Sequence, residues 1–265
     1  MRSALSLEFR FLIWANLGVA VIFGLLLFFL PTYTEIYAPW VFSHPRSAIL
    51  IGVGYLSAAI YYVSVLRQND WVQARNGALN LIVFSLVLLF ATSTDWSAFR
   101  AYHPITLAWL FYYYANPLFV PMIARSQNII TQGASEGEVE VAPPWRAWLS
   151  IRGIFYLAVA LFIFLFVDTA RNVWPWPTTG LDLRVFTGFI AVVGLSGAAA
   201  IATVSWQRLR LGLVFSGALG LLHLVGLLAG RVEYNWSAPL GILLPVMFAE
   251  WFLTSLALHV VYRKQ

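Results

Sequence analysis

Eight apolar segments, each close to 20 residues long, constrain this chain more than any other feature. A helix rises 1.5 Å per residue, so about 20 apolar residues cross the hydrocarbon core of a bilayer. In lipid, every backbone N–H and C=O must be bonded within the protein, and no alternating β pattern is present, so we expect helices. The segments fall at about 11–30, 47–66, 77–94, 105–124, 153–170, 185–205, 211–230 and 239–262.

The composition agrees with this interpretation. Of the 265 residues, 61% are hydrophobic and only 10% are charged, whereas soluble domains carry about 25% charged residues. The sequence therefore predicts an all-α integral membrane protein with eight transmembrane helices, whose first partner is the lipid bilayer.

The distribution of Lys and Arg predicts the orientation. Eight spans place both termini on one side, and that side carries 11 Lys and Arg residues against five in the opposite loops. Arg152, just before the fifth segment, is counted on the side of the termini. Because basic residues are retained in the cytoplasm, we expect a multi-pass protein of the cell membrane with both termini cytoplasmic. Five tryptophans in the opposite loops are typical of an interfacial belt: Trp40, Trp96, Trp174, Trp176 and Trp236.

The chain also repeats itself in order. The spacing Trp-x-x-x-Arg recurs after 135 residues, as does the proline that opens a span; the matched segments are Trp71 to Arg75 with Trp206 to Arg210, and Pro104 with Pro239. We expect a first four-helix repeat at 1–125, a cytoplasmic linker at 126–150 and a second four-helix repeat at 151–265. An even number of spans in each unit predicts parallel repeats. Small residues enrich segments 47–66 and 185–205, so we expect those helices at the centre.

Glu250 is the most unusual residue of the spans. It follows Pro239 by 11 residues, or about 16 Å, which is close to the midplane, where an ionised group costs at least about 2.5 kcal/mol. His223 lies at a similar depth in the seventh segment, so we expect a His223–Glu250 pair. The alternative is a neutral Glu250 bonded to a backbone carbonyl and a locally satisfied His223. The corresponding positions of the first half, Leu88 and Ala115, are apolar.

Two Trp and Arg pairs mark the end of the bundle that carries the termini. If the helices continue there, Trp71 shares a face with Arg75, and Trp206 shares a face with Arg210. Such pairs are candidates for cation–π contacts or for binding a lipid phosphate. The alternative is an interfacial tryptophan beside an arginine that serves orientation only.

Several classes of function lack support in the sequence. The chain has no cysteine, and its net charge of +5 is scattered, so we expect no thiolate chemistry and no nucleic acid partner. No metal-ligand cluster, phosphate-binding glycine loop or catalytic triad motif is recognisable. The cofactor is left unassigned; haem between two histidines is disfavoured because no two histidines share a depth in the membrane.

The stretch Trp174-Pro-Trp-Pro177, followed by Leu-Asp-Leu-Arg184, Gly188 and the Trp206 to Arg210 motif, resembles a group of uncharacterised multi-pass bacterial membrane proteins. In these, a Trp-Pro-Trp loop precedes an Arg-led helix rich in Gly and Ala. The first half retains only Pro39, Trp40 and Arg46 of this pattern. The resemblance implies a polytopic bacterial membrane protein and carries no known activity, so it assigns no catalytic residue.

Three functions are compatible with these features. The first is a non-catalytic structural or accessory subunit of a membrane assembly, in contact with other membrane subunits. The second is a small transporter or lipid-handling protein with a cavity near Glu250. The third is an intramembrane enzyme in which His223 and Glu250 act as acid and base. We expect them in that order, because few polar residues converge at depth.

Overall fold

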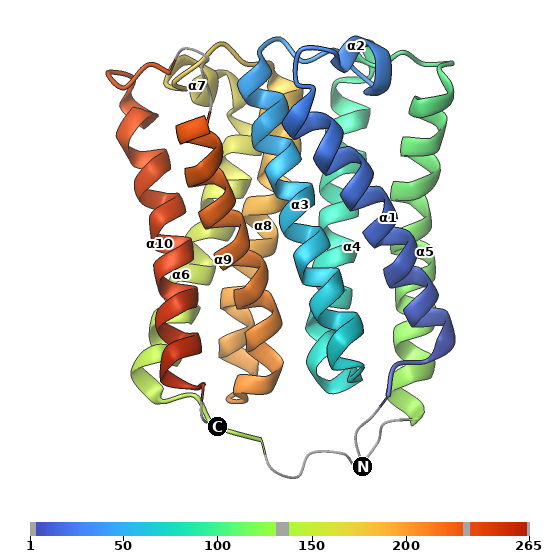
Figure 1. The fold of residues 1–265 in the computed structure, drawn as a ribbon, viewed down its shortest axis with the longest axis vertical. Coiled ribbons are helices and arrows are strands. Elements are labelled where there is room, and N and C mark those ends of the chain that lie inside the picture. The colour runs from blue at the N-terminus through green and yellow to red at the C-terminus, as the bar shows by residue number, and fades with distance from the viewer. Residues whose placement is uncertain (1–3, 131–137, 230–233, 264–265) are drawn as a thin grey trace.

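The computed structural model describes residues 4–130, 138–229 and 234–263. In these residues eight long helices run along the same axis, and α1 begins at the end of the bundle where α10 ends (Figure 1). They are α1 (Leu7–Phe29), α3 (Pro45–Gln68), α4 (Trp71–Thr94), α5 (Pro104–Ile130), α6 (Pro143–Leu165), α8 (Gly180–Ala202), α9 (Trp206–Ala229) and α10 (Pro239–Val261). Three short elements lie at the opposite end: α2 (Thr34–Tyr37), η1 (Trp96–Ala98) and α7 (Val167–Asn172).

Seven helices among the described residues are long and apolar enough to cross a membrane. The predicted all-α fold with multiple membrane-spanning helices is therefore confirmed. The remaining long helix, α5, falls outside this set because of its composition. It has 27 residues but includes three consecutive tyrosines, Asn116 and two internal prolines, which lower its hydropathy.

Local chemistry sets the helix boundaries. Proline occupies the first turn of α3, α6 and α10, where its missing N–H has no intrahelical partner to lose. Asp70 caps α4 by accepting from Val72 N. Asn69, with a φ of 47°, ends α3 in the left-handed conformation and so allows the tight turn into α4. A capping box of Thr179 and Asp182 opens α8.

Glycine allows a close contact between the backbones of α6 and α8. A Cβ atom on Gly153 would lie 2.1 Å from the backbone nitrogen of Ala198 and 2.6 Å from the carbonyl carbon of Gly197. The two backbones therefore touch directly, as small residues permit in lipid. α8 and α3 are the two most buried of the seven candidate spans, in line with their glycine and alanine content.

The helices pair in a regular way. α1 packs on α3 and α6 on α8, while α5 packs on α4 and α10 on α9. The N-terminal helices contact the C-terminal helices in two corresponding places, where α4 packs on α8 and α3 packs on α9. α3, α4, α8 and α9 therefore form the centre, and α1, α5, α6 and α10 lie outside them.

Two boundaries differ from the sequence interpretation. The fifth span begins at Pro143, about ten residues earlier than hydropathy predicted, and ends at Leu165, about five residues earlier. Arg152 therefore lies inside α6 and not before it. The expected linker is also shorter, because α5 extends to Ile130 and α6 starts at Pro143. Its centre, residues 131–137, lies outside the described residues. The end of the linker docks on the α8–α9 turn, where Trp206 N donates to Val139 O at 2.8 Å.

Candidate functional site

A charged cluster joins α6 to α10 near the middle of both helices. Arg152 Nε donates to Glu250 Oε1 at 2.7 Å. Tyr156 OH donates to Glu250 Oε2 at 2.8 Å, and Thr254 Oγ1 donates to Oε1 at 2.7 Å. Arg152 follows the start of α6 by nine residues and Glu250 follows the start of α10 by 11, so they lie about 14 and 16 Å from opposite helix ends. The cluster is therefore at mid-depth.

The environment of the two charges is unequal. The Arg152 side chain is 2% exposed, whereas that of Glu250 is 24% exposed. Glu250 is well satisfied by three donors, as a carboxylate at such a depth must be. Arg152 is not: its Nη1 and Nη2 are buried without a hydrogen-bond partner among the described residues, although its guanidinium lies 5.3 Å from the centre of the Tyr156 ring. The site can therefore hold an ionised carboxylate and still offers buried donors to one further acceptor.

His223 is not part of this cluster. Its Nδ1 lies 2.7 Å from Leu219 O and its Nε2 lies 3.1 Å from Leu50 O, and the ring stacks on Phe248 with centroids 4.3 Å apart. Among the described residues no hydrogen bond joins His223 to Glu250, so the structure does not bring the predicted pair together. Arg152 supplies the counter-charge instead. Sequence reasoning missed it because Arg152 had been counted as a flanking residue; its spacing from Pro143 was the available signal.

The N-terminal helices carry an uncharged counterpart of this cluster. Asn16 follows the start of α1 by nine residues, as Arg152 follows the start of α6. Its amide nitrogen lies 3.4 Å from Asn116 Oδ1 on α5, and Tyr112 OH donates to Asn16 Oδ1. Amides thus bridge α1 to α5 where a charge pair bridges α6 to α10.

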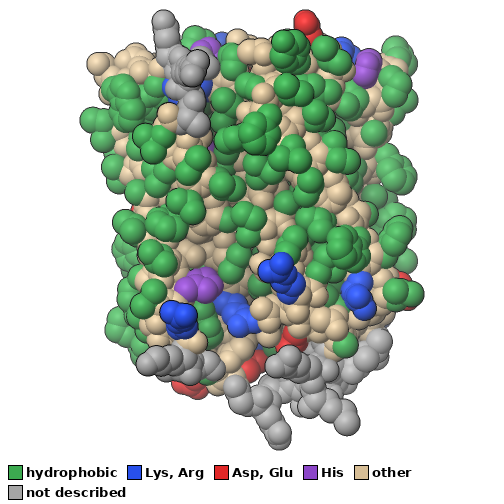
Figure 2. Space-filling view, viewed as in Figure 1, with side chains coloured by type: hydrophobic (Ala, Val, Ile, Leu, Met, Phe, Trp, Pro, Cys, Tyr) green, Lys and Arg blue, Asp and Glu red, His purple; other side chains and the backbone are tan. Residues whose placement is uncertain are grey.

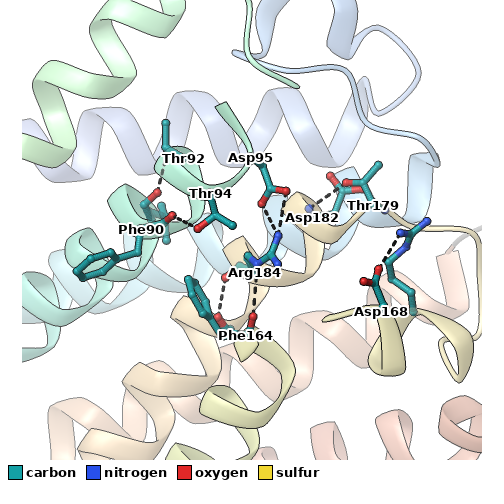
Figure 3. A network of polar contacts seen from close by, with 12 residues as sticks. Phe90, Thr92, Thr94, Asp95, Phe164, Asp168, Thr179, Asp182 and Arg184 are labelled. Carbon is teal, nitrogen blue, oxygen red and sulfur yellow. Dashed lines mark hydrogen bonds and ion pairs between the residues drawn. The ribbon is translucent and has the colours of Figure 1, made fainter. Parts of the chain in front are cut away.

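At the end opposite the termini, a second ion pair joins α8 to α4. Arg184 Nη1 donates to both oxygens of Asp95, at 2.9 and 2.7 Å, and Arg184 Nε donates to Phe164 O at 3.4 Å (Figure 3). Asp95 is the C-cap residue of α4, and Phe164 lies in the last turn of α6. One guanidinium therefore fixes three helices.

Three of the tryptophans in the loops at this end, Trp40, Trp174 and Trp176, point inwards. Trp40 Nε1 donates to Asp182 Oδ1 at 3.0 Å, and Trp176 Nε1 donates to Ser47 Oγ at 3.0 Å. Trp40, Trp174 and Trp176 are 2, 6 and 5% exposed. The expectation of an interfacial belt is therefore wrong for these three rings, which pack inside the bundle, whereas Trp96 and Trp236 are 42 and 59% exposed. Each of these two bonds joins an N-terminal to a C-terminal helix or loop.

Tyr234 and Arg46 complete this layer. The Arg46 guanidinium lies 5.1 Å from the centre of the Tyr234 ring, and Tyr234 OH donates to Gly241 O at 2.7 Å. Burial raises the pKa of Tyr234 to about 12, so its hydroxyl stays protonated as this donor.

At the end that carries the termini, the members of the two predicted pairs of Trp and Arg contact other residues or are exposed. Trp71 Nε1 donates to Asn128 Oδ1 at 2.7 Å, and its ring is 1% exposed, whereas Arg75 is exposed. Trp206 stacks on Tyr262, with centroids 5.1 Å apart, and Arg210 Nε donates to Gln73 Oε1 at 3.0 Å. The cation–π contacts found among the described residues involve Arg46, Arg152 and Arg184, none of which belongs to these pairs.

Two interior cavities are small. One of about 40 Å³ lies between α3, α4, α8 and α9 and is lined by Tyr61, Tyr62, Asn80 and Phe189, among others. The second, of about 20 Å³, lies beside His223, Arg46 and Trp176. By volume each accommodates one to a few waters.

Comparisons with protein-family models, with curated proteins and with solved structures found no match to the chain. The resemblance drawn from the Trp-Pro-Trp loop stays an expectation.

Proposed function

We propose that this chain is a non-catalytic structural or accessory subunit of a membrane assembly. It crosses the cell membrane eight times as two parallel four-helix repeats, with both termini in the cytoplasm.

Helix pairing supports the two repeats. In the two repeats, α1 corresponds to α6, α3 to α8, α4 to α9, and α5 to α10. With this correspondence, the packed pair α1–α3 matches α6–α8, and the pair α4–α5 matches α9–α10. The contact between α4 and α8 likewise matches the contact between α9 and α3. The bridges Asn16–Asn116 and Arg152–Glu250 match as well. A pseudo-two-fold axis along the membrane normal accounts for all of these relations. The length of α5, 27 residues, supports an eighth span, and the excess of Lys and Arg supports the orientation.

The observation that carries the structural role is how the polar side chains at depth are used. They bond helix to helix, as Arg152 with Glu250, Asn16 with Asn116, and Asn80 with Ser196 at 3.0 Å. The cavity between the four central helices is about 40 Å³, whereas small-molecule sites occupy about 300–1,000 Å³. Large apolar side chains cover the outward faces, among them Phe111, Phe119, Phe155 and Phe162, each at least 50% exposed. Such faces suit lipid and other membrane helices.

A density map of the protein, extracted gently in its native lipid, tests this role. We expect a second polypeptide against the outward face of α5, α6 or α10. Glu250→Gln should leave that particle intact, because Gln retains acceptor and size. A lone chain surrounded only by lipid contradicts the proposal.

A second function, transport or lipid handling near Glu250, is favoured by one observation. Arg152 Nη1 and Nη2 are buried donors that find no acceptor within the described part of the chain, and they lie beside a carboxylate that is 24% exposed. An anionic group entering between α6 and α10 would satisfy them. In that case Glu250→Gln abolishes proton-coupled movement of the substrate across vesicles, a change that a structural subunit does not undergo.

A further inference from the structure

An open groove lies between α3, α9 and α10, at the end of the bundle where α1 begins. Its volume is about 470 Å³, and its walls come from the last turns of α3 and α10 and the first turns of α9. Ser64 and Gln68 line it from α3, and His259 and Arg263 from the end of α10. The groove is more than ten times larger than either interior cavity.

The groove is divided by polarity. Arg210, Arg263, His259, Ser64 and Gln68 supply its hydrogen-bonding and positive side chains. Leu211, Val214 and Val260 supply apolar walls next to them along α9 and α10. This is the combination that a phospholipid requires: cationic donors for the phosphate and an apolar track for the first part of an acyl chain.

One wall of the groove is rigid. Trp206 stacks on Tyr262 at an interplanar angle of 23° and meets the His259 ring edge-on, with centroids 5.0 Å apart. Tyr262 OH accepts from Ala142 N at 2.7 Å, and His259 Nδ1 lies 2.8 Å from Ser255 O. The wall is therefore held in place before anything binds.

The charge of the groove is positive. None of the described residues that line it is acidic. Glu138, an acid at the same end of the molecule, is held 2.7 Å from Arg208 in an ion pair. Glu140, whose backbone pairs with Ser205, is exposed to solvent. Figure 2 shows Lys and Arg side chains and a His side chain towards the lower end of the molecule, below a broad band of hydrophobic side chains, with Asp and Glu side chains beneath them.

We infer that this groove binds the headgroup of an anionic phospholipid, with Arg210 and Arg263 at the phosphate and Trp206 and Tyr262 as the supporting wall. The inference rests on the proposed placement of this end at the cytoplasmic membrane surface. There, basic pockets between transmembrane helices are typical binding sites for anionic headgroups.

Native mass spectrometry of the full chain, loaded with phosphatidylglycerol or phosphatidylcholine, tests this. We expect one phosphatidylglycerol to be retained in preference to phosphatidylcholine by about 30-fold, since two arginines contribute. Arg210→Gln with Arg263→Gln should reduce this preference to about onefold. Arg10→Gln with Arg125→Gln is the matched control: both residues are exposed, lie at the same end and are outside the groove. It should retain the preference.

Arg210 also bonds Gln73, so a second variant separates charge from folding. Gln73→Ala removes that bond and leaves both groove charges, and it should keep the preference for phosphatidylglycerol. The inference is overturned if the groove variant keeps the preference, or if either control loses it as fully. It is equally overturned if soluble glycerol phosphate displaces the lipid at similar concentration, because the site then recognises free phosphate. None of these outcomes depends on whether a second polypeptide accompanies the chain, so the inference and the proposed function fail separately.

Discussion

Arg152 Nε and Glu250 Oε1 lie 2.7 Å apart, which ties α6 to α10 across 98 residues of sequence. A charge pair at this depth is costly to form, and it is far more costly to leave half-made.

We expect Glu250→Leu to destabilise the protein by about 3 kcal/mol, because it strands the Arg152 guanidinium in an apolar setting. Arg152→Leu with Glu250→Leu should be more stable than Glu250→Leu alone, since no charge is then left unpaired. Unfolding in detergent, followed by circular dichroism, measures both. Asn16→Leu, at the uncharged counterpart, should cost only about 1 kcal/mol. If the losses in unfolding free energy of Arg152→Leu and Glu250→Leu add up to the loss in the double variant, the two side chains do not stabilise each other and the prediction is wrong.

Gly153 should tolerate no side chain. Gly153→Ala places a methyl group 2.1 Å from Ala198 N, so α6 must move away from α8. A loss of at least about 2 kcal/mol is expected, by analogy with overpacked cores. Gly18→Ala in α1 is the control, since its Cβ meets no atom within 4 Å, and it should be neutral or stabilising by up to about 1 kcal/mol. The midpoints of thermal unfolding compare the two; equal midpoints would contradict the close α6–α8 contact.

The Asp95–Arg184 ion pair should stabilise the protein more than the Asp168–Arg171 pair does. The side chains of the first are 23 and 14% exposed and those of the second 87 and 47%. Asp95→Asn should cost about 1–3 kcal/mol, because a half-buried charged hydrogen bond is lost. Asp168→Asn should cost less than about 1 kcal/mol, as an exposed pair does. Urea unfolding of both variants measures the two losses in unfolding free energy. Similar losses would show that burial does not make the Asp95–Arg184 pair the more stabilising one.

Labelling of single cysteines placed before and after α5 tests whether this helix crosses the membrane. The chain has no cysteine, so single cysteines report without background. Tyr102, before α5, is 95% exposed, and Glu140, after it, is also exposed. Tyr102→Cys should react with an impermeant maleimide from outside intact cells, and Glu140→Cys only after permeabilisation. If both react from the same side, the eighth span is excluded.

Much of the architecture could be predicted from the length and position of the apolar segments. The long helices follow the apolar segments, and the glycine-rich segments became the buried α3 and α8. The site could not be predicted, because hydropathy placed the start of the fifth span after Arg152. An arginine paired with an acid far along the chain looks, in sequence, like one that marks a membrane boundary. Trp40 and Trp176 were misread for a similar reason: only the packed loops supply partners for their indole N–H groups.

The crossed indole bonds also limit how the molecule can deform. Trp40 reaches forward in the sequence to Asp182, while Trp176 reaches back to Ser47, so two tethers fasten the same end in opposite directions. Pulling the N-terminal helices away from the C-terminal ones would strain both tethers at once. The end with the basic groove is also joined across the two halves, because Arg210 Nε donates to Gln73 Oε1 and Asn76 Nδ2 donates to Arg208 O. The halves therefore cannot separate at either end without breaking hydrogen bonds between them.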